Sequence, residues 1–507
     1  MEYLAPGVFI EEVEKGPKPI EGVSTSTAAF LGETSRGPVR PRLITSYNDY
    51  LRLFGNVFRA GQYTPHAVKS FFDNGGRRVY ITRIVGANAQ ASSAAIGNYV
   101  VSAVGPGVSG DRVFVRLQDS STNDENGNPI GFRLQVFTWD RLPPNGQVFD
   151  PVALPNQLPR PTVSEDFDDI STDPAHPNYF DKRINNDNSS LITLAVPDNE
   201  PPPGGLTAQA LANGSDGNAV GTPDYDGNNP DPALRRGLAA LDLDPFRDVS
   251  IVYAPNATDA VRRSVITHCE NNRFRFAVLD AAQAQGNIAN IDPRSDRSTQ
   301  YAAFYYPWVS ISDPLTGQRM QVPPGGAVCG IYARSDNTRG VFKSPANEIV
   351  RGAMDLEYDI NHDAQGILNP RGVNVIRRFP GRGIRVWGAR TLSADPLWKY
   401  VSVRRLFIFL EHSIYNSTQW VVFEPNDSRL WARVQQTITL FLRTQWRNGA
   451  LMGTKEEEAF QINVGRDTMT ADDILNGRLI VEIGIAPVRP AEFVIFRIYQ
   501  KTLESQA

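Results

Sequence analysis

Two apolar runs near the C-terminus, separated by a proline-bracketed turn, constrain the fold of this chain more than any other feature. They read RLIVEIGIAPVRPAEFVIFRIYQKT, residues 478–502, and the alternation of apolar residues along each run is typical of β-strands. Pro487 and Pro490 stiffen the connection, so the second run need not fold back on the first. A strand that is apolar on both faces needs a ladder partner, because an open edge of this kind templates pairing with another chain. That partner is either the chain's own sheet or another copy of the protein.

The length of 507 residues predicts several domains, because one hydrophobic core cannot serve a chain of this size. A hydrophobic fraction of 41% with 21% charged residues is typical of soluble globular proteins, and no apolar run approaches the length that crosses a bilayer. We therefore expect a protein that folds in the cytoplasm and does not insert into a membrane. Cys269 and Cys329 lie far apart and outside any metal-ligand spacing, so we expect both to be reduced and buried.

Charge is unevenly divided along the chain. Residues 99–231 carry 7 basic and 19 acidic side chains, whereas residues 370–507 carry 19 basic and 13 acidic side chains. Such an asymmetry informs on partners and solubility rather than on fold. The arginines of the C-terminal part are spread among core-forming residues without a dense patch, so we expect no nucleic-acid binding.

The patterning divides the chain into five parts. Residues 1–24 are an arm, with one strand in GVFIEEV and a Pro/Gly-rich tether after it. Residues 25–98 and 232–355 form an α/β core domain, because amphipathic helices such as TPHAVKSFFDNGG and NATDAVRRSVITHCENN alternate with short apolar runs. Those runs, expected to be strands of a mostly parallel sheet, are AAFLG, RVYITRIV, VSIVYAP, RFAVLD and AVCGIYA.

Residues 99–231 interrupt the core domain as an insertion. This acidic segment opens with the strand-like VVSAV, RVFVRLQ and FRLQVFTW and then becomes rich in proline and glycine, so we expect it to be solvent-facing and to build little core. Residues 356–490 are expected to form a compact α+β domain, and residues 491–507 a C-terminal arm.

Two helices are expected in the 356–490 domain. Asp395 is a candidate cap for the first, and Asp427 or Ser428 begins the second. A strand is expected at WVVFEP, between the two helices. The buried stripe of the second helix is expected to be Leu430, Val434, Ile438, Phe441 and Leu442.

No motif in the sequence predicts catalysis, a metal or a cofactor. His268 and Cys269 are adjacent, and adjacent residues on a helix point about 100° apart, so they cannot act as a pair. FPGRGIRVWGARTL lacks the GxxxxGK[ST] spacing of a phosphate loop, and no strand clearly precedes it. DENGNP and DYDGNNPD resemble calcium loops but lack the glutamate at the twelfth position. We expect structural turns at all three loops.

Several long stretches nevertheless resemble a known family. YAAFYYPWVSISDPLTGQRMQVPPGGAVCGIYARSDNTRGVFKSPAN, residues 301–347, is similar to the middle signature of contractile phage tail sheath proteins. Residues 369–434, from NPRGVNVIRRFPGRG to NDSRLWARV, and residues 472–496 resemble the C-terminal sheath domain, and YLAPGVFIEEV with STSTAAFLGETSRGPV resembles the start of the family. The resemblance covers roughly residues 1–98 and 232–507, and the insertion matches no family that we can name.

The resemblance implies a structural protein of a phage tail, an R-type pyocin or a related contractile injection particle. Such a sheath polymerises around an inner tube in a metastable extended state and contracts to drive the tube through a target envelope. The implied partners are neighbouring copies, the inner tube protein, and the baseplate and terminator or cap proteins at the ends. The implied fold is an α/β core with a loop-heavy β insertion and a C-terminal α+β domain whose sheet is completed by arms of neighbouring subunits.

Two sets of residues follow from the resemblance. The arm side chains expected to fill a neighbour's pockets are Val8, Phe9, Ile10, Val13, Phe493, Val494, Ile495, Phe496, Ile498 and Tyr499. The C-terminal domain of the family is the inner layer, so its surplus of positive charge implies an acidic tube exterior, with Arg433, Arg443 and Arg447 as candidate tube contacts. The alternative for these arginines is that they satisfy local carboxylates and helix C-terminal carbonyls.

Two other classes of protein remain open at this point. A doubly wound α/β enzyme would bind a nucleotide at the carboxyl ends of its strands, but it predicts a glycine fingerprint that the sequence lacks. A non-contractile tube or lattice protein would share self-assembly without the signatures at 301–347 and 369–434.

Overall fold

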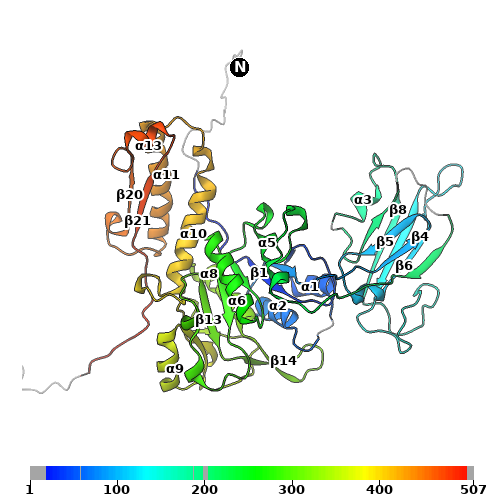
Figure 1. Ribbon diagram of the computed structural model, residues 1–507, viewed down its shortest axis with the longest axis horizontal. Coiled ribbons are helices and arrows are strands. Elements are labelled where there is room, and N and C mark those ends of the chain that lie inside the picture. The colour runs from blue at the N-terminus through cyan, green and yellow to red at the C-terminus, as the bar shows by residue number, and fades with distance from the viewer. Residues whose placement is uncertain (1–18, 57–58, 187, 198–203, 499–507) are drawn as a thin grey trace, which may run out of the picture. The chain divides into compact units, whose positions relative to one another are not determined.

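The computed structural model describes residues 19–56, 59–186, 188–197 and 204–498 of the chain (Figure 1). These residues divide into two compact units. The larger unit is Ser24–Arg404, and the smaller unit joins the residues before Ser24 to those from Arg405 onward. The two units are considered separately below.

The larger unit is built on a nine-stranded sheet with the order β16-β19-β18-β13-β12-β11-β1-β3-β2. The six central strands run parallel: β18 (Val373–Phe379), β13 (Ala302–Tyr306), β12 (Phe276–Asp280), β11 (Ile251–Tyr253), β1 (Ala28–Gly32) and β3 (Val79–Arg83). Two strands run antiparallel to these six, β19 (Gly383–Val386) at one end and β2 (Arg42–Ile44) at the other, and the edge strand β16 (Glu348–Ile349) pairs antiparallel with β19. Four of the five predicted core strands are therefore confirmed, in a mostly parallel sheet.

Helices cover both faces of this sheet. Neighbouring residues of a strand point to opposite faces, so a single strand contacts helices on both sides. Phe30 of β1 contacts Phe71 of α2 (Thr64–Asp73), with ring centroids 5.4 Å apart. Leu31 joins the cluster on the other face, which includes Val265 of α6 (Asp259–Asn272). Thr258 caps α6 through its hydroxyl. The other helices of this unit are α1 (Tyr47–Phe54), α3 (Phe180–Arg183), α4 (Thr222–Asp226), α5 (Gly237–Leu241), α7 (Pro293–Asp296), α8 (Gly325–Arg339) and α9 (His362–Leu368).

The fifth predicted core strand, AVCGIYA, is wrong, because these residues belong to helix α8. A short apolar run does not distinguish a buried strand from a buried helix, and α8 is buried on almost all sides over its first three turns. Gly326 and Gly330 let α8 approach α2 closely, since a Cβ atom at Gly326 would lie 2.5 Å from the Ala67 carbonyl oxygen. Cys329 of α8 and Cys269 of α6 are both buried, as expected, and they do not form a disulfide with each other.

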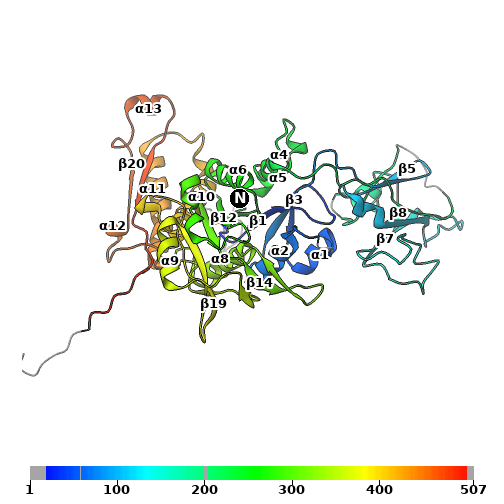
Figure 2. The same cartoon turned by 60° about the horizontal axis from the view of Figure 1, so that its bottom comes forward.

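The inserted segment has a hydrophobic core of its own, so the expectation that it builds little core is wrong. The predicted strands β5 (Tyr99–Ala103), β6 (Val113–Asp119) and β7 (Phe132–Thr138) are joined by strands from the loop-rich part and by one strand that lies before residue 99, the expected start of the insertion (Figure 2). The added strands are β4 (Ser93–Ile96), β8 (Val163–Ile170), β9 (Ile192–Ala195) and β10 (Thr207–Ala210), giving sheets β10-β6-β7-β8 and β4-β5-β9. Prolines and glycines fill the connections, while the short strands bury side chains such as Leu134, Ile170 and Leu194 between the sheets.

The smaller unit contains α11 (Ser428–Arg447), α12 (Glu456–Ala459) and α13 (Ala471–Leu475) with strands β20 (Phe460–Val464) and β21 (Val481–Ile485). Helix α10 (Val401–Ser417) includes the boundary with the larger unit. Asp427 caps α11 through its carboxylate, and the predicted stripe of α11 is buried in full. Asp395 caps only a short 3₁₀ turn, Pro396–Trp398, ahead of α10.

Two expectations for this region need correction. WVVFEP is not a strand, because Gln419–Val421 form a 3₁₀ turn and Phe423 adopts a left-handed backbone conformation with φ of 69°. The expected domain start at residue 356 also differs from the structural division at Arg404, because β18 and β19 extend the large sheet. A further small sheet, β15-β14-β17, lies in the larger unit and consists of β14 (Val309–Ser312), β15 (Arg319–Val322) and β17 (Asp355–Leu356).

A buried carboxyl group lies at the carboxyl end of β12. The Asp280 carboxylate, 3% exposed, accepts hydrogen bonds from the Tyr253 hydroxyl at 2.5 Å and from the Gly325 amide at the start of α8 at 2.8 Å. Burial raises the pKa of Asp280 to about 7, although both hydrogen bonds and the nearby charge of Arg262 favour its ionised form. Ionisation of this group is therefore coupled to the stability of the core.

The stability of the protein is expected to fall as Asp280 ionises. Its folded pKa, about 7, exceeds the ordinary value of 3.8, so its stabilising contribution is complete below about pH 4 and is lost as the pH rises through about 7. Asp280→Asn keeps an acceptor for Gly325 but cannot ionise. We expect the unfolding free energy, measured with urea, to fall between about pH 5 and about pH 8. This fall should be larger in the parent protein than in Asp280→Asn. Equal losses would contradict this assignment.

Candidate assembly surface

The sheet of the smaller unit has only two strands in the part of the chain that the structure describes. Strands β20 and β21 pair antiparallel, with Ile462 opposite Ile483. Val481, Ile483 and Ile485 of β21 are half-buried on one face, and Glu482 and Gly484 are exposed on the other. A sheet of this size is marginal by itself, and an edge strand such as β21 can accept another strand through its outward backbone groups. This sheet is therefore short of strands within the described residues.

An apolar groove of about 920 Å³ lies beside this sheet. Leu479, Val481 and Ile483 line one wall, and the buried stripe of α11 supplies Leu430, Val434 and Ile438 on another. The remaining lining residues are Ile414, Thr418, Gln419, Val421, Val422, Phe423, Glu424, Asn426 and Gly477. The groove is therefore large enough and apolar enough to bind several hydrophobic side chains.

The predicted C-terminal arm exposes its apolar side chains. From residue 488 to 498 the chain belongs to no helix or strand and runs away from β21 as an extended trace (Figure 1). Phe493, Val494, Ile495, Phe496 and Ile498 are 68–94% exposed. Contiguous exposure of this kind marks a surface that binds another molecule. The other predicted arm residues, Val8, Phe9, Ile10, Val13 and Tyr499, lie outside the described residues.

The three candidate tube contacts lie on α11 and differ in their surroundings. Arg433 pairs with Glu424 at 3.0 Å and lies 4.3 Å from the centre of the Trp420 ring. Arg443 donates two hydrogen bonds to Glu456, at 2.6 and 2.9 Å. Arg447 is exposed in the last turn of the helix. Arg433 and Arg443 thus make the local ion pairs that the alternative interpretation predicts, and contact with a tube stays a prediction for all three.

The residues considered for chemistry have structural surroundings. Burial lowers the pKa of His268 to about 3 and raises that of Cys269 to about 12, which leaves a neutral imidazole and an unreactive thiol. His268 instead contacts Arg275, with 2.7 Å between ring nitrogen and guanidinium. FPGRG does follow a strand, β18, but it forms the turn of the β18–β19 hairpin rather than a loop leading into a helix. Among the described residues, no group of three or more His, Cys, Asp and Glu is arranged to hold a metal ion.

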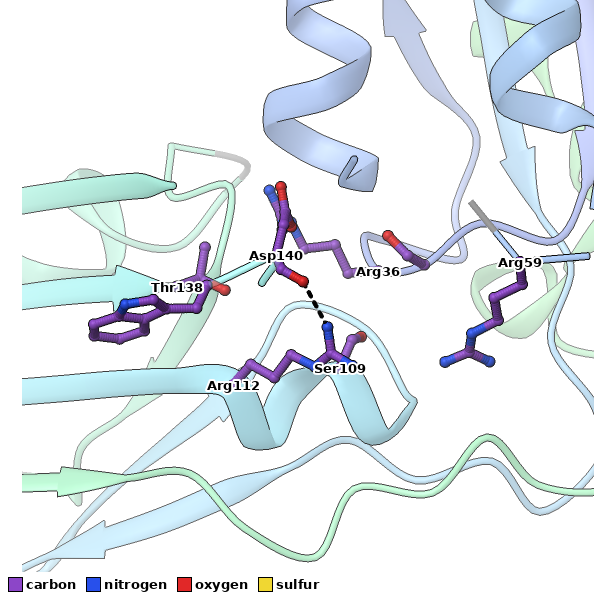
Figure 3. A pocket seen from close by; sticks show the side chains of 8 residues that line it. Arg36, Arg59, Ser109, Arg112, Thr138 and Asp140 are labelled. Atoms are coloured by element: carbon purple, nitrogen blue, oxygen red, sulfur yellow. Dashed lines mark hydrogen bonds and ion pairs between the residues drawn. The ribbon is translucent and has the colours of Figure 1, made fainter. Parts of the chain in front are cut away.

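The root of the inserted segment is a charged junction that the sequence does not reveal. Arg36 pairs with Asp140, whose backbone oxygen also accepts a hydrogen bond from Arg112 at 2.9 Å (Figure 3). Arg59 pairs with Asp216 at 2.9 Å. In both ion pairs, the core residue and the insertion residue are more than 100 positions apart in sequence. Neither arginine lies in a recognisable sequence motif, so the sequence does not indicate these pairs. The junction fixes the insertion to the core and encloses only about 10 Å³, room for one water molecule.

An incomplete sheet, an open apolar groove and an exposed apolar segment define a subunit that associates with other chains. Residues 218–392 match the family described as phage tail sheath protein central domain, and residues 393–501 match the phage tail sheath C-terminal domain. Together these matches cover more than half of the chain, and the chain belongs to the phage tail sheath family. Members of this family are structural proteins, in agreement with the expectation that the chain is not an enzyme.

Individual relatives support the same assignment. The tail sheath protein of Burkholderia phage BcepMu is 22% identical over 481 residues, covering 89% of this chain and 88% of the relative. The tail sheath protein of Salmonella phage ViI is 24% identical over 281 residues, but the match spans 50% of this chain and only 43% of that protein. A solved sheath complex of the extracellular contractile injection system PVC, in the contracted state, has the same fold, with a TM-score of 0.61, 24% identity and full coverage of both chains.

No helix among the described residues is both long and apolar enough to cross a membrane.

Proposed function

We propose that this chain is the structural subunit of a contractile sheath, which polymerises around an inner tube and contracts to drive that tube through a target envelope. The observation that carries the proposal is the juxtaposition, in one small unit, of a two-stranded sheet, an apolar groove and an exposed apolar arm. Membership of the tail sheath family supplies the class of assembly. Assembly takes place in the bacterial cytoplasm, and the product is part of a phage tail or of a tail-like injection particle.

The arms are the proposed links between copies. A C-terminal arm from one copy, and an N-terminal arm from another, pair with the sheet of a neighbour by β-augmentation. Phe493, Val494, Ile495, Phe496 and Ile498 then enter apolar pockets, and their burial contributes roughly 8–15 kcal/mol before ordering costs. Ordering about ten residues costs a similar amount, so one arm alone binds weakly while a lattice of arms holds.

Contraction requires two packings of the same subunits. The free-energy difference between them supplies the work, and the bodies rotate while the paired strands persist. The segments that permit this rotation are the tether EKGPKPIEG and the connection APVRPAE, in which prolines prevent regular structure. The remaining proposed partners are the inner tube, the baseplate, and a terminator or cap at the ends. Arg433, Arg443 and Arg447 are proposed to face the tube.

Electron microscopy of the protein expressed alone tests self-assembly. We expect the full chain to form long hollow tubes and a version lacking residues 1–20 to remain monomeric or form short oligomers, because the latter lacks one of its two links. Negative staining of both at matched high concentration is sufficient. If both versions stay monomeric, strand exchange is not the assembly device, and if both form tubes, the N-terminal arm is dispensable.

A further inference from the structure

The positive charge of the C-terminal part is concentrated in a short segment of the larger unit. Residues 370–404 hold eight Lys and Arg against one Asp, whereas residues 405–507 hold eleven against twelve acidic residues. The smaller unit also includes residues 1–23, which hold two basic and five acidic residues, so it carries no surplus of positive charge. The surplus charge that the sequence assigned to an inner domain lies on and around the β18–β19 hairpin of the core sheet.

The hairpin holds its arginines on a rigid aromatic support. Phe379 ends β18 and packs against Trp387, with ring centroids 4.4 Å apart. The Arg382 guanidinium lies 5.5 Å from the Phe379 ring and 5.7 Å from the Trp387 ring, and Arg377 lies 5.2 Å from Phe379. The hairpin containing β19, the second strand from one edge of the sheet, projects beyond the neighbouring elements (Figure 2). Stacked guanidiniums lose less freedom when they bind a carboxylate than free side chains do.

Three of these arginines keep an uncompensated charge within the part of the chain that the structure describes. Arg377 donates to the Ile360 carbonyl oxygen and to Gln365, and Arg385 donates to two backbone carbonyl oxygens. The exposed Arg382 donates to the amide oxygen of Asn347 at 2.9 Å. All of these acceptors are neutral. Arg378, by contrast, forms an ion pair with Asp355.

We propose that the hairpin of residues 377–385, here called the arginine hairpin, binds the acidic inserted segment of a second copy of this chain. The segment from 99 to 231, with 19 acidic and 7 basic residues, is the strongest opposite charge in the molecule. Its edge strand β8 carries Glu165, Asp166, Asp168 and Asp169. Asp166 and Asp168 share one local cation, Arg133, so their combined charge is only partly compensated, and Asp166 is 44% exposed. Complementary potentials of this kind select partner and register at an interface.

The contact rests on the proposed function, because a lattice of copies must form before the two surfaces meet. It adds to the arm links a second connection, between the core of one copy and the insertion of another. Charge pairs at an exposed rim are weakened by salt, so this connection is expected to depend on ionic strength more than the apolar arms do.

Zero-length cross-linking tests this contact in tubes of the full chain expressed alone. Carbodiimide joins amines to carboxylates but does not react with guanidinium, so Arg382→Lys places a single reactive amine in the hairpin while keeping its charge. Mixing isotopically labelled and unlabelled chains identifies links between copies. We expect peptides containing position 382 to be joined to carboxylates within 99–231 of another copy. Arg339→Lys, also at an exposed position, near the end of α8, is the matched control and should give few such links.

The outcomes separate this inference from the proposed function. Tubes whose position 382 links only to carboxylates outside 99–231, or to none, would overturn the hairpin contact and leave sheath assembly standing. Failure of the parent chain to form any tubes would overturn both.

Discussion

A chain that ends at Pro490 will fold normally and will not assemble. The removed segment contains five large apolar side chains that are 68–94% exposed in the single chain, so its loss costs the folded monomer almost nothing. In the assembled lattice the same side chains are proposed to be buried, and their removal deletes roughly 8–15 kcal/mol of contact per copy. We expect the thermal unfolding midpoint to be unchanged and tubes to be absent, as measured by calorimetry and by sedimentation with negative-stain microscopy.

A single substitution provides a sharper version of this experiment. Phe496→Asp should raise the concentration needed for assembly by about 10- to 100-fold, because burying one large apolar side chain contributes about 1.5–3 kcal/mol and each 1.4 kcal/mol is a factor of about ten. Leu475→Asp is the matched control, since Leu475 is 86% exposed, similarly apolar and outside the arm. Tubes that form equally well from Phe496→Asp and Leu475→Asp would contradict the role of the arm.

Removing the Arg275 side chain is expected to destabilise the larger unit by about 3–5 kcal/mol. This is the typical cost of removing one partner from a buried charged interaction. Arg275 is 3% exposed and donates to His268 at 2.7 Å and to the carbonyl oxygens of Leu241 and Phe246 at 2.5 and 2.9 Å. In Arg275→Ala those three acceptors lose their donor in a place that water does not reach. The shift of the urea unfolding midpoint measures the effect.

Arg263→Ala is the control for this substitution. Arg263 lies on α6, 55% exposed, and its ion pair with Asp296 is at the surface, so its loss should cost no more than about 1 kcal/mol. A shift for Arg275→Ala no larger than that for Arg263→Ala would show that the buried network does not stabilise the fold.

Local signals predicted much of the secondary structure. Asp427, one of the two residues expected to begin the second helix, caps α11, since a side-chain oxygen next to free backbone amides acts over three residues and depends on little else. The stripe on α11 was predicted residue by residue, because its period of 3.6 is long enough to be unambiguous. AVCGIYA failed for the opposite reason, being short and apolar on all sides, so that only packing against α2 identifies it as a helix.

The sequence did not predict the core of the insertion. Proline and glycine content describes the whole segment, whereas the core is formed by the few apolar residues that lie between the turns. Ile192 and Leu194 of β9 are buried although they lie among such turns. The charge division was misassigned for a related reason. Residues 370–404 are continuous in sequence with the smaller unit, but β18 hydrogen-bonds to β13, so the arginines around the hairpin belong to the core sheet.

By itself the sequence determined the family, the parallel α/β core and the exposed apolar arm, because each depends on residues close together in the chain. Only the tertiary structure decided where the surplus charge lies, that the insertion has a core, and that β20, β21 and α11 enclose an apolar groove. Those features join residues far apart in sequence, and their positions follow from strand pairing and packing, which no local pattern encodes.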